Sequence, residues 1–267
     1  MLPSRPSSAS LLAALTFVCS LAPAGPALAE DFHVSNKVYV PEKAPAASTT
    51  LFAAGRVYDF LEASDGKIME TMVFDKANDL VILLDPDRQM KTEISTGDVS
   101  TQIGRLREAA KAPRLPESVR FSVSPQFSER VDPKTGKLTL DAKWMQYAVT
   151  SEAPKNPFTA RQYNEFADWL AQTNALLNPP NMPFARLKLN EVLKQRQEIP
   201  TEIELTIKPE GRRKPYVIRS EHKIQWGLSA TDKRRIDDVA EQLHTFNLVT
   251  FEAYHKPPEP QGKQAAK

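Results

Sequence analysis

Hydrophobic and polar residues alternate from residue 51 to residue 94, which predicts a run of β-strands. Asp65-Gly66 is a two-residue hairpin signal, and Asp85-Pro86-Asp87 places Asp and Pro at the first two positions of a turn. An aliphatic run just before the second turn predicts a strand that is covered on both faces. We therefore expect an antiparallel meander with strands at 51–61, 67–74, 80–84 and 89–94.

The apolar positions change to a helical period in three later segments. Ser95 with Asp98 resembles a capping box for the first helix, Thr159 can cap the second, and Thr231 or Ser229 can cap the third. The helical segments are 95–111, 159–177 and about 231–246. Further strands are expected near 121–127, 137–149, 203–207, 216–226 and 247–254.

This order of elements predicts an α+β fold with a curved, half-barrel-like antiparallel sheet and about three helices packed on its concave face. Strands and helices do not alternate strictly, which disfavours a doubly wound parallel sheet. A single α+β domain is expected over 51–255, after an extended lead-in over 30–50, with a break near Pro154 to Pro157 as the alternative. Prolines without an apolar cluster predict a disordered tail over 256–267.

The first 29 residues have the three parts of a signal peptide. Arg5 gives the positive start, residues 11–21 give an apolar stretch too short to span a bilayer, and Ala27-Leu28-Ala29 is a small-x-small cleavage site. We expect export to the periplasm or the extracellular space, and a soluble protein after cleavage near Ala29. Cys19 is the only cysteine and lies inside this segment, so the exported chain has no disulfide and no cysteine nucleophile.

The charge balance and the glycine content exclude some classes of function. The chain has 35 Lys and Arg against 33 Asp and Glu, a formal net charge of +2, so a nucleic-acid partner is not expected. Its 9 glycines against 22 prolines disfavour folds built on glycine-rich phosphate loops. Clusters of basic residues at 212–214 and 233–235 are interpreted as solvated turn and helix residues, with anionic lipid headgroups as the alternative partner.

No catalytic or metal-binding motif is present in the sequence. The nucleophile elbow, the zinc helix, the P-loop and the dinucleotide fingerprint all need glycines or histidines that this chain lacks. We therefore predict no catalytic residue, no metal, no cofactor and no enzymatic activity. The four histidines are spread along the chain and are interpreted as unrelated residues: His33, His222, His244 and His255. The paired carboxylates are interpreted as turn residues or as residues of solvated faces: Glu202, Glu204, Asp237, Asp238, Asp85 and Asp87.

Aromatic residues are the most suggestive candidates for a ligand site. They belong to strands and helices that would line the concave side of the sheet, where they form either a packed core or the lining of an apolar cavity. The candidate lining residues are Phe52, Tyr58, Phe60, Phe74, Trp144, Phe166, Trp169 and Trp226.

The arrangement resembles the exported lipoprotein-carrier fold of the LolA/LolB type, the half-barrel shared by the periplasmic carrier and its outer-membrane receptor. The resemblance rests on a signal peptide, a meander whose strands end in Val73-Phe74-Asp75 and Leu83-Leu84-Asp85-Pro86, a following helix, and the proline-led strand Ile199-Pro200-Thr201-Glu202-Ile203-Glu204-Leu205. It covers 51–226 as an order of elements. Extra helical segments and the proline-rich tail depart from the family. The resemblance implies the fold and assigns no individual ligand-binding residue.

Two functions from different classes follow from these observations. The first is an exported, non-enzymatic envelope protein that binds a lipid or another apolar small molecule inside the curved sheet. The alternative is a structural or interaction module of the cell envelope, with a fully packed sheet, no ligand and a protein partner. A cavity inside the sheet favours the first, and a filled interior favours the second.

Overall fold

The computed structural model describes residues 31–111, 114–178, 182–209, 211 and 214–256. The expected signal peptide at 1–29 lies outside the described residues. The same holds for all but the first residue of the expected tail, and for Arg212 and Arg213 of the first basic cluster.

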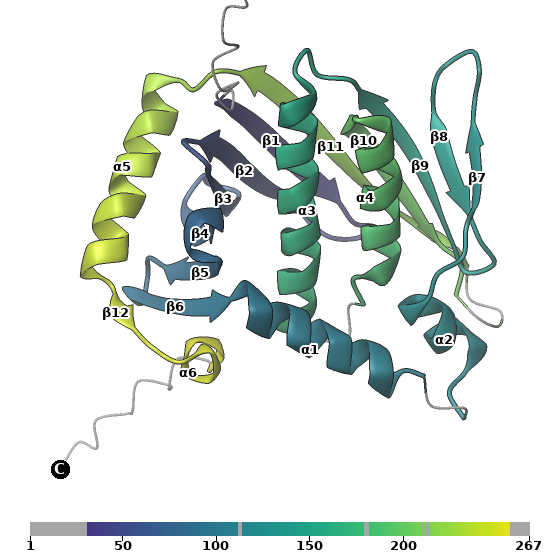
Figure 1. Ribbon diagram of the computed structural model, residues 1–267, viewed down its shortest axis with the longest axis horizontal. Coiled ribbons are helices and arrows are strands. Elements are labelled where there is room, and N and C mark those ends of the chain that lie inside the picture. Colours follow the sequence, from purple (N-terminus) through teal and green to yellow (C-terminus); the bar gives the residue numbers. More distant parts are fainter. Residues whose placement is uncertain (1–30, 112–113, 179–181, 210, 212–213, 257–267) are drawn as a thin grey trace, which may run out of the picture.

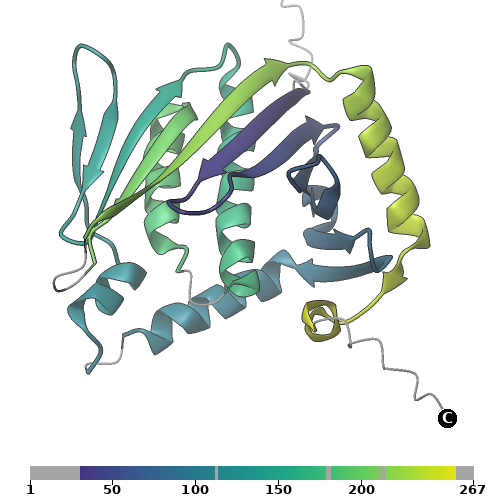
Figure 2. The ribbon, with the colours of Figure 1, turned by 180° about the vertical axis from the view of Figure 1, so that it is seen from behind.

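The described residues form one sheet of 12 strands in the order β12-β6-β5-β4-β3-β2-β1-β11-β10-β9-β8-β7 (Figures 1 and 2). All neighbouring strands are antiparallel except β12 and β6, which are parallel. The strands are β1 (Phe32–Tyr39), β2 (Ala46–Ala53), β3 (Arg56–Glu62), β4 (Ile68–Asp75), β5 (Leu80–Asp85), β6 (Met90–Ser95), β7 (Ser128–Val131), β8 (Leu138–Asp141), β9 (Met145–Glu152), β10 (Ile199–Ile207), β11 (Tyr216–Trp226) and β12 (Asn247–Leu248).

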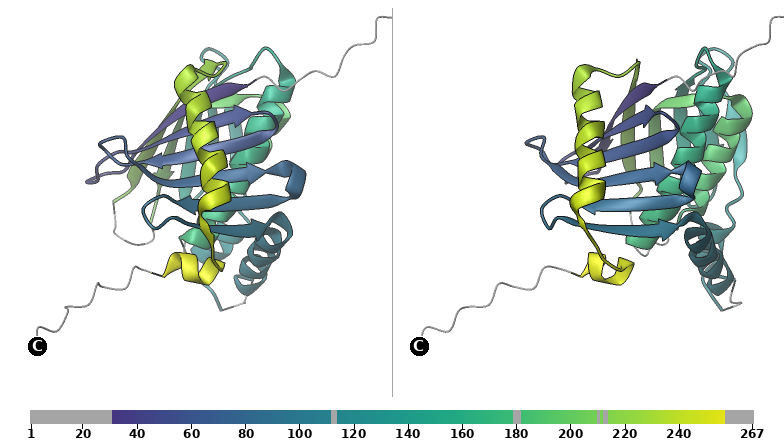
Figure 3. Two further views of the ribbon diagram at one scale, coloured as in Figure 1. Left: turned by 90° about the vertical axis from the view of Figure 1, so that its left-hand side faces the viewer. Right: turned by 60° about the vertical axis from the view of Figure 1, so that its left-hand side comes forward.

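Helices cover both faces of this sheet. They are α1 (Thr96–Ala109), α2 (Glu117–Val123), α3 (Pro157–Leu177), α4 (Phe184–Arg196), α5 (Ala230–Thr245) and α6 (Phe251–His255), with a short 3₁₀ turn at Lys76–Asn78. In Figure 1, α3 and α4 lie side by side in front of the strands. The right-hand view of Figure 3 shows strands β3 to β6 passing between α5 on one side and α3 with α4 on the other. We call the face under α3 and α4 the inner face, and the face under α5 the outer face.

The alternation of side chains along the strands assigns residues to these two faces. On β2, Phe52 belongs to the inner core with Phe166 of α3, while Leu51 belongs to the outer core with Val239 of α5. Leu189 of α4 belongs to a third buried hydrophobic cluster, together with Tyr147 and other residues of β8 to β10. The expected α+β class with a curved, mainly antiparallel sheet is therefore confirmed.

The helices differ in place from the expectation. Helix α5 covers the outer face rather than the concave one, because β2 to β5 carry apolar side chains on both faces and its Ile236, Val239 and Leu243 pack against them. The expected helix at 95–111 is present with Ser95 as its N-cap, and α5 is capped by Ser229. Helix α3 begins at Pro157 with Asn156 as its N-cap, not at Thr159, because proline is well placed in the first turn.

The first strands differ from the expected pattern in two places. The segment expected as an extended lead-in forms β1 and most of β2, and β1 lies in the middle of the sheet between β2 and β11. The single strand expected at 51–61 is a hairpin, because Ala54 and Gly55 form a two-residue turn with φ of 48° and 81°.

Four later segments also differ. The strand expected near 121–127 is not formed, because a short apolar run fits either period: residues 117–123 form helix α2, and the next strand, β7, begins at Ser128. Residues 184–196 form helix α4, whose buried Leu189, Val192 and Leu193 are separated by polar positions that hide the pattern in the sequence. The strand expected over 137–149 is split into β8 and β9 by a turn, and the last expected strand is reduced to β12, followed by α6.

Candidate functional site

A cavity of about 460 Å³ lies between the inner face of the sheet and helices α3 and α4. One wall is a stripe along α3 that repeats at helical spacing from Tyr163 to Leu177. At a rise of about 1.5 Å per residue this stripe is about 21 Å long. The α3 residues of the wall are Tyr163, Phe166, Ala167, Leu170, Ala171, Asn174 and Leu177. The volume is in the range of about 300–1,000 Å³ that is usual for small-molecule sites.

The opposite wall is the inner face of the sheet. Its apolar part is formed by inward-facing residues of β1, β3, β4 and β9 to β11, and α4 adds Arg186. These side chains are Val38, Leu61, Met72, Tyr147, Ile203, Leu205 and Ile218. A concave space with mostly apolar walls and few polar groups is typical of a site for a hydrophobic ligand.

A row of hydrogen-bonded polar side chains crosses the floor of the cavity from β3 to β11. Thr50 Oγ1 donates to Asp59 Oδ1 at 2.6 Å, and Asn36 Nδ2 donates to Thr50 Oγ1 at 2.9 Å. His222 Nδ1 donates to Asn36 Oδ1 at 2.8 Å, and Ser220 Oγ lies 3.1 Å from His222 Nε2. We call these five residues the polar ladder.

The hydrogen bonds of the polar ladder all run in the same donor-to-acceptor direction, because each side chain has a fixed set of donor and acceptor atoms. The amide nitrogen of Asn36 is a donor, so its oxygen must accept from a protonated Nδ1 of His222. The neutral imidazole then has an unprotonated Nε2, which accepts from the Ser220 hydroxyl. Every bond therefore points toward Asp59, which accepts at the end of the chain.

Burial changes the pKa of both titratable ends of the ladder. Burial raises the pKa of Asp59 to about 6, although hydrogen bonds from Thr50 and Ser48 act in the opposite direction. Burial lowers the pKa of His222 to about 3, and the positive charge of Arg186 adds to this effect. At neutral pH the imidazole is therefore uncharged, in agreement with the hydrogen-bond directions.

A second carboxylate, Glu70 of β4, lines the cavity beside β3. Tyr254 of α6 donates from its hydroxyl to Glu70 Oε2 at 3.1 Å, which brings the end of the described chain against this side of the sheet. Burial raises the pKa of Glu70, and the hydrogen bond from Tyr254 offsets part of that rise. The two carboxylates that line the cavity, Asp59 and Glu70, therefore lie on the neighbouring strands β3 and β4.

The aromatic residues expected to line a ligand site are distributed over several places. Phe166 lines the cavity, and Phe52 packs edge-on against it at 5.7 Å between ring centroids. Phe74 lies 5.8 Å from Trp169 in the adjoining inner core, and Trp169 also lines a separate cavity of about 490 Å³ beside α3.

The remaining expected residues lie away from the cavity. Tyr58 and Phe60 belong to the outer core under α5. Trp144 packs against Phe121 at 5.2 Å, and Trp226 packs against Phe32 at 5.8 Å with 43% of its surface exposed. The structure therefore brings Phe52, Phe74, Phe166 and Trp169 together and separates the other four.

Sequence reasoning missed the polar ladder and Arg186. A usable signal was present, because Asn36, Thr50 and Asp59 lie in phase with buried residues of their strands. A polar residue at an inward position is more informative than an apolar one, because burial of an unpartnered polar group is unfavourable. His222 alternates with Ile224 in the sequence, but its partner Asn36 is 186 residues away.

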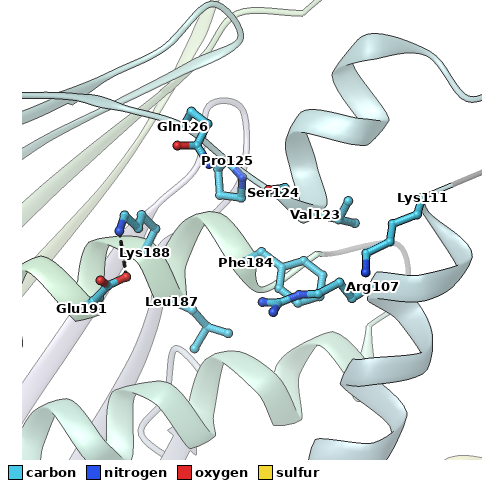
Figure 4. A pocket seen from close by; sticks show the side chains of 10 residues that line it. All are labelled: Arg107, Lys111, Val123, Ser124, Pro125, Gln126, Phe184, Leu187, Lys188 and Glu191. Carbon is cyan, nitrogen blue, oxygen red and sulfur yellow. Dashed lines mark hydrogen bonds and ion pairs between the residues drawn. The ribbon is translucent and has the colours of Figure 1, made fainter. Parts of the chain in front are cut away.

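A smaller groove of about 290 Å³ lies between α1, α4 and the segment after α2 (Figure 4). Arg107 lies over the ring of Phe184, with its guanidinium carbon 4.5 Å from the ring centroid, and Lys111 lies just beyond the C-terminal end of the same helix. The lysines of this groove are already paired, Lys111 with Glu108 at 2.6 Å and Lys188 with Glu191 at 2.9 Å. The central cavity is therefore the stronger candidate site.

The described residues contain neither a metal-binding cluster nor a membrane-spanning helix. Within the described ranges, no group of three or more His, Asp or Glu side chains is placed to hold a metal ion. No helix in the part of the chain that the structure describes is long and apolar enough to cross a membrane.

Comparisons with known proteins give no family. No protein-family model matches the sequence, and no curated protein matches it. Two structures of PNGF-II are similar to 85% and 83% of this chain, with 9% and 8% sequence identity and TM-scores of 0.33 and 0.34, and the match covers only 32% and 31% of their own length. A LolA superfamily protein from Nitrosomonas europaea is similar to 76% of this chain and is itself covered to 88%, with 7% identity and a TM-score of 0.25. These similarities, all with TM-scores under 0.5, assign neither a fold family nor a function.

Proposed function

We propose that the protein is an exported, non-enzymatic protein of the cell envelope that binds a lipid or another apolar small molecule in the central cavity. The observation that carries this proposal is the space of about 460 Å³ between the inner face of the sheet and α3, with apolar walls and a polar ladder across its floor. The signal-peptide pattern at residues 1–29 supports export.

The cavity favours this proposal over an interaction module with a fully packed sheet. Protein interiors are close-packed, and they contain few voids larger than a water molecule. A space of this size beside Phe166, Leu170 and Ile203 lacks the dispersion contacts that a packed core would supply. An apolar ligand would restore those contacts and would remove the walls from water.

The first test is native mass spectrometry of the gently purified protein, followed by organic extraction of bound molecules. We expect an adduct of defined mass that is released by denaturation and recovered in the extract. After the bound molecules have been removed, the folded protein should bind a fluorescent apolar probe with a stoichiometry of about one, since one central cavity is proposed.

A pair of variants locates the binding. Ala171→Trp places a large ring in the cavity wall and should abolish the adduct and weaken probe binding by about tenfold or more. Ala109→Trp makes the same change at an exposed position of α1 and should leave both unchanged. Equal binding by both variants, or a clean mass with no probe binding to the unsubstituted protein, would contradict the proposal.

A second candidate function is hydrolysis of an acyl ester, and one geometric observation favours it. Ser220 Oγ, His222 and Asn36 have the connectivity of a nucleophile, a base and a group that orients the base, at 3.1 Å and 2.8 Å. A general base works best with a pKa near the operating pH, whereas burial lowers the pKa of His222 to about 3. Turnover of p-nitrophenyl dodecanoate that is lost in Ser220→Ala would support the hydrolase and would contradict the carrier.

A further inference from the structure

Arg186 is the single Lys or Arg among the described residues that line the central cavity. It comes from the first turn of α4, opposite the sheet. Its charge offsets part of the rise that burial causes in the pKa of Tyr147, Tyr163 and Asp168, and adds to the lowering of the pKa of His222. Tyr147 of β9, Tyr163 of α3 and His222 of β11 line the same cavity as Arg186.

Two residues of the helices hold Arg186 in this place. Its Nε donates to Asn190 Oδ1 at 2.9 Å, and Asn190 Nδ2 donates to Asp168 Oδ1 of α3 at 2.8 Å. Asn190 is buried, with 1% of its surface exposed, so its amide is fixed by these bonds. These two hydrogen bonds orient the guanidinium through Nε, and its direct partner is an amide, with the Asp168 carboxylate one side chain further away.

Arg186 forms no ion pair with a carboxylate of the described residues. Arg186 is half-buried, and a charge that is partly removed from water is stabilised by a counter-charge. Its neighbours Tyr147, Tyr163 and His222 are uncharged at neutral pH, since burial favours their neutral forms. A guanidinium that no carboxylate of the described residues contacts directly therefore faces the ligand space.

The carboxylates of the cavity lie on its other side and have partners of their own. Asp59 of β3 accepts from Thr50, and Glu70 of β4 accepts from Tyr254. Strands β3 and β11 are separated by β2 and β1, which corresponds to about 14 Å at the usual spacing of neighbouring strands. The cavity thus has an acidic side at β3 and β4 and a cationic side at α4 and β9 to β11.

We infer that the ligand of this cavity is a single-chain anionic amphiphile whose oxyanion head, a carboxylate or a phosphate monoester, binds Arg186. The inference rests on the proposed function and specifies the chemistry of its ligand. Arginine presents its N–H groups in a planar fork that matches carboxylate and phosphate oxygens in pairs. The apolar chain lies along the α3 stripe from Phe166 to Leu177, where its burial supplies the hydrophobic part of the binding.

The experiment compares four ligands with the same chain of twelve carbons: dodecanoate, dodecyl phosphate, dodecanol and dodecyltrimethylammonium. Each is titrated against the purified protein by displacement of the apolar probe at neutral pH and below its micellar concentration. We expect at least one of the two anions to bind about tenfold or more tightly than dodecanol, and the cation to bind more weakly than dodecanol. The two anions distinguish a carboxylate head from a phosphate head.

Variants assign the preference to Arg186. Arg186→Gln should reduce the affinity for the preferred anion by about tenfold and leave dodecanol binding unchanged, while Arg186→Lys should retain part of the preference. Arg107→Gln, which removes a guanidinium from the smaller groove, should leave all four affinities unchanged. Far-UV circular dichroism and the Tm identify a variant that does not fold, and the preference of the unsubstituted protein tests the inference without any variant.

The outcomes separate this inference from the proposed function. Equal binding of dodecanol and both anions would overturn the anionic ligand and leave an apolar binding protein. Tighter binding of the cation than of dodecanol would overturn the anionic ligand and would indicate a cationic head group that binds the acidic side of the cavity. No binding of any of the four ligands would overturn both proposals.

Discussion

His222 Nδ1 donates a 2.8 Å hydrogen bond to Asn36 Oδ1, and this bond joins two strands whose residues are 186 positions apart. The two residues lie directly opposite each other, where β1 pairs with β11. The bond is the link of the polar ladder between the first and last long strands of the sheet. It therefore couples the pairing of β1 with β11 to the polar ladder on the cavity floor.

Replacement of Asn36 by Ala should destabilise the protein by about 1–3 kcal/mol, because the Nδ1–H group of His222 and the hydroxyl of Thr50 each lose a partner in a partly buried place. Urea unfolding followed by circular dichroism measures the change. Thr101→Ala removes an exposed helix hydroxyl and should change the free energy of unfolding by less than about 0.5 kcal/mol. Equal effects of the two variants would show that the ladder does not contribute to stability.

The raised pKa of Asp59, about 6, predicts how stability depends on pH. The folded protein binds this proton more tightly than the unfolded chain, so the stabilisation is present below pH 4 and is lost as the pH rises through 6. Asp59→Asn should therefore gain stability relative to the unsubstituted protein between pH 4 and pH 7, by on the order of 1–2 kcal/mol after allowance for screening by water.

Urea unfolding at intervals between pH 4 and pH 8 tests this dependence. Asp132→Asn is the control, because hydrogen bonds from the backbone of Lys134 and Thr135 lower the pKa of Asp132 and keep its titration below this range. If the difference in free energy of unfolding between Asp59→Asn and the unsubstituted protein did not change with pH, that result would contradict the burial of an ionised Asp59.

His222 should give the opposite dependence of the free energy of unfolding on pH. Burial lowers its pKa to about 3, so the unfolded chain binds a proton near pH 6.5 that the folded protein does not bind. Stability from this residue is complete above pH 6.5 and falls as the pH falls toward 3. His222→Gln should therefore be more stable relative to the unsubstituted protein at pH 4.5 than at pH 8, as measured by urea unfolding. The reverse slope would mean that the imidazole is charged in the folded protein.

The turn between β2 and β3 can be improved by one substitution. Ala54 has a φ of 48° and Gly55 a φ of 81°, and a left-handed conformation is unfavourable for Ala but tolerated by Asn. Ala54→Asn should raise the free energy of unfolding by about 0.5–1 kcal/mol. Gly55→Ala should lower it by about 1 kcal/mol, because it places a side chain at the second left-handed position. A change of the same sign in both variants would contradict this conformation of the turn.

The local pattern of the chain was enough for much of the fold. Strands β4, β5 and β6 and helices α1, α3 and α5 agree with the periodicity of their apolar residues, because each buries one face or both against a neighbour. The turn at Ala54 and Gly55 was missed because this pair is a less usual signal than the Asp65-Gly66 pair that follows it. Helix α4 was missed because polar residues interrupt its buried positions.

The sequence by itself determined the α+β class, the meander and the absence of cysteine after position 19, since these depend on local period and on composition. Only the tertiary structure decided which face α5 covers and which side chains meet. Asn36, Asp59, Arg186 and His222 are far apart in the sequence and share no local motif. Pairing of β1 with β11, and packing of α4 over the inner face, bring them to one cavity because non-local strand order is set by the burial of the whole sheet.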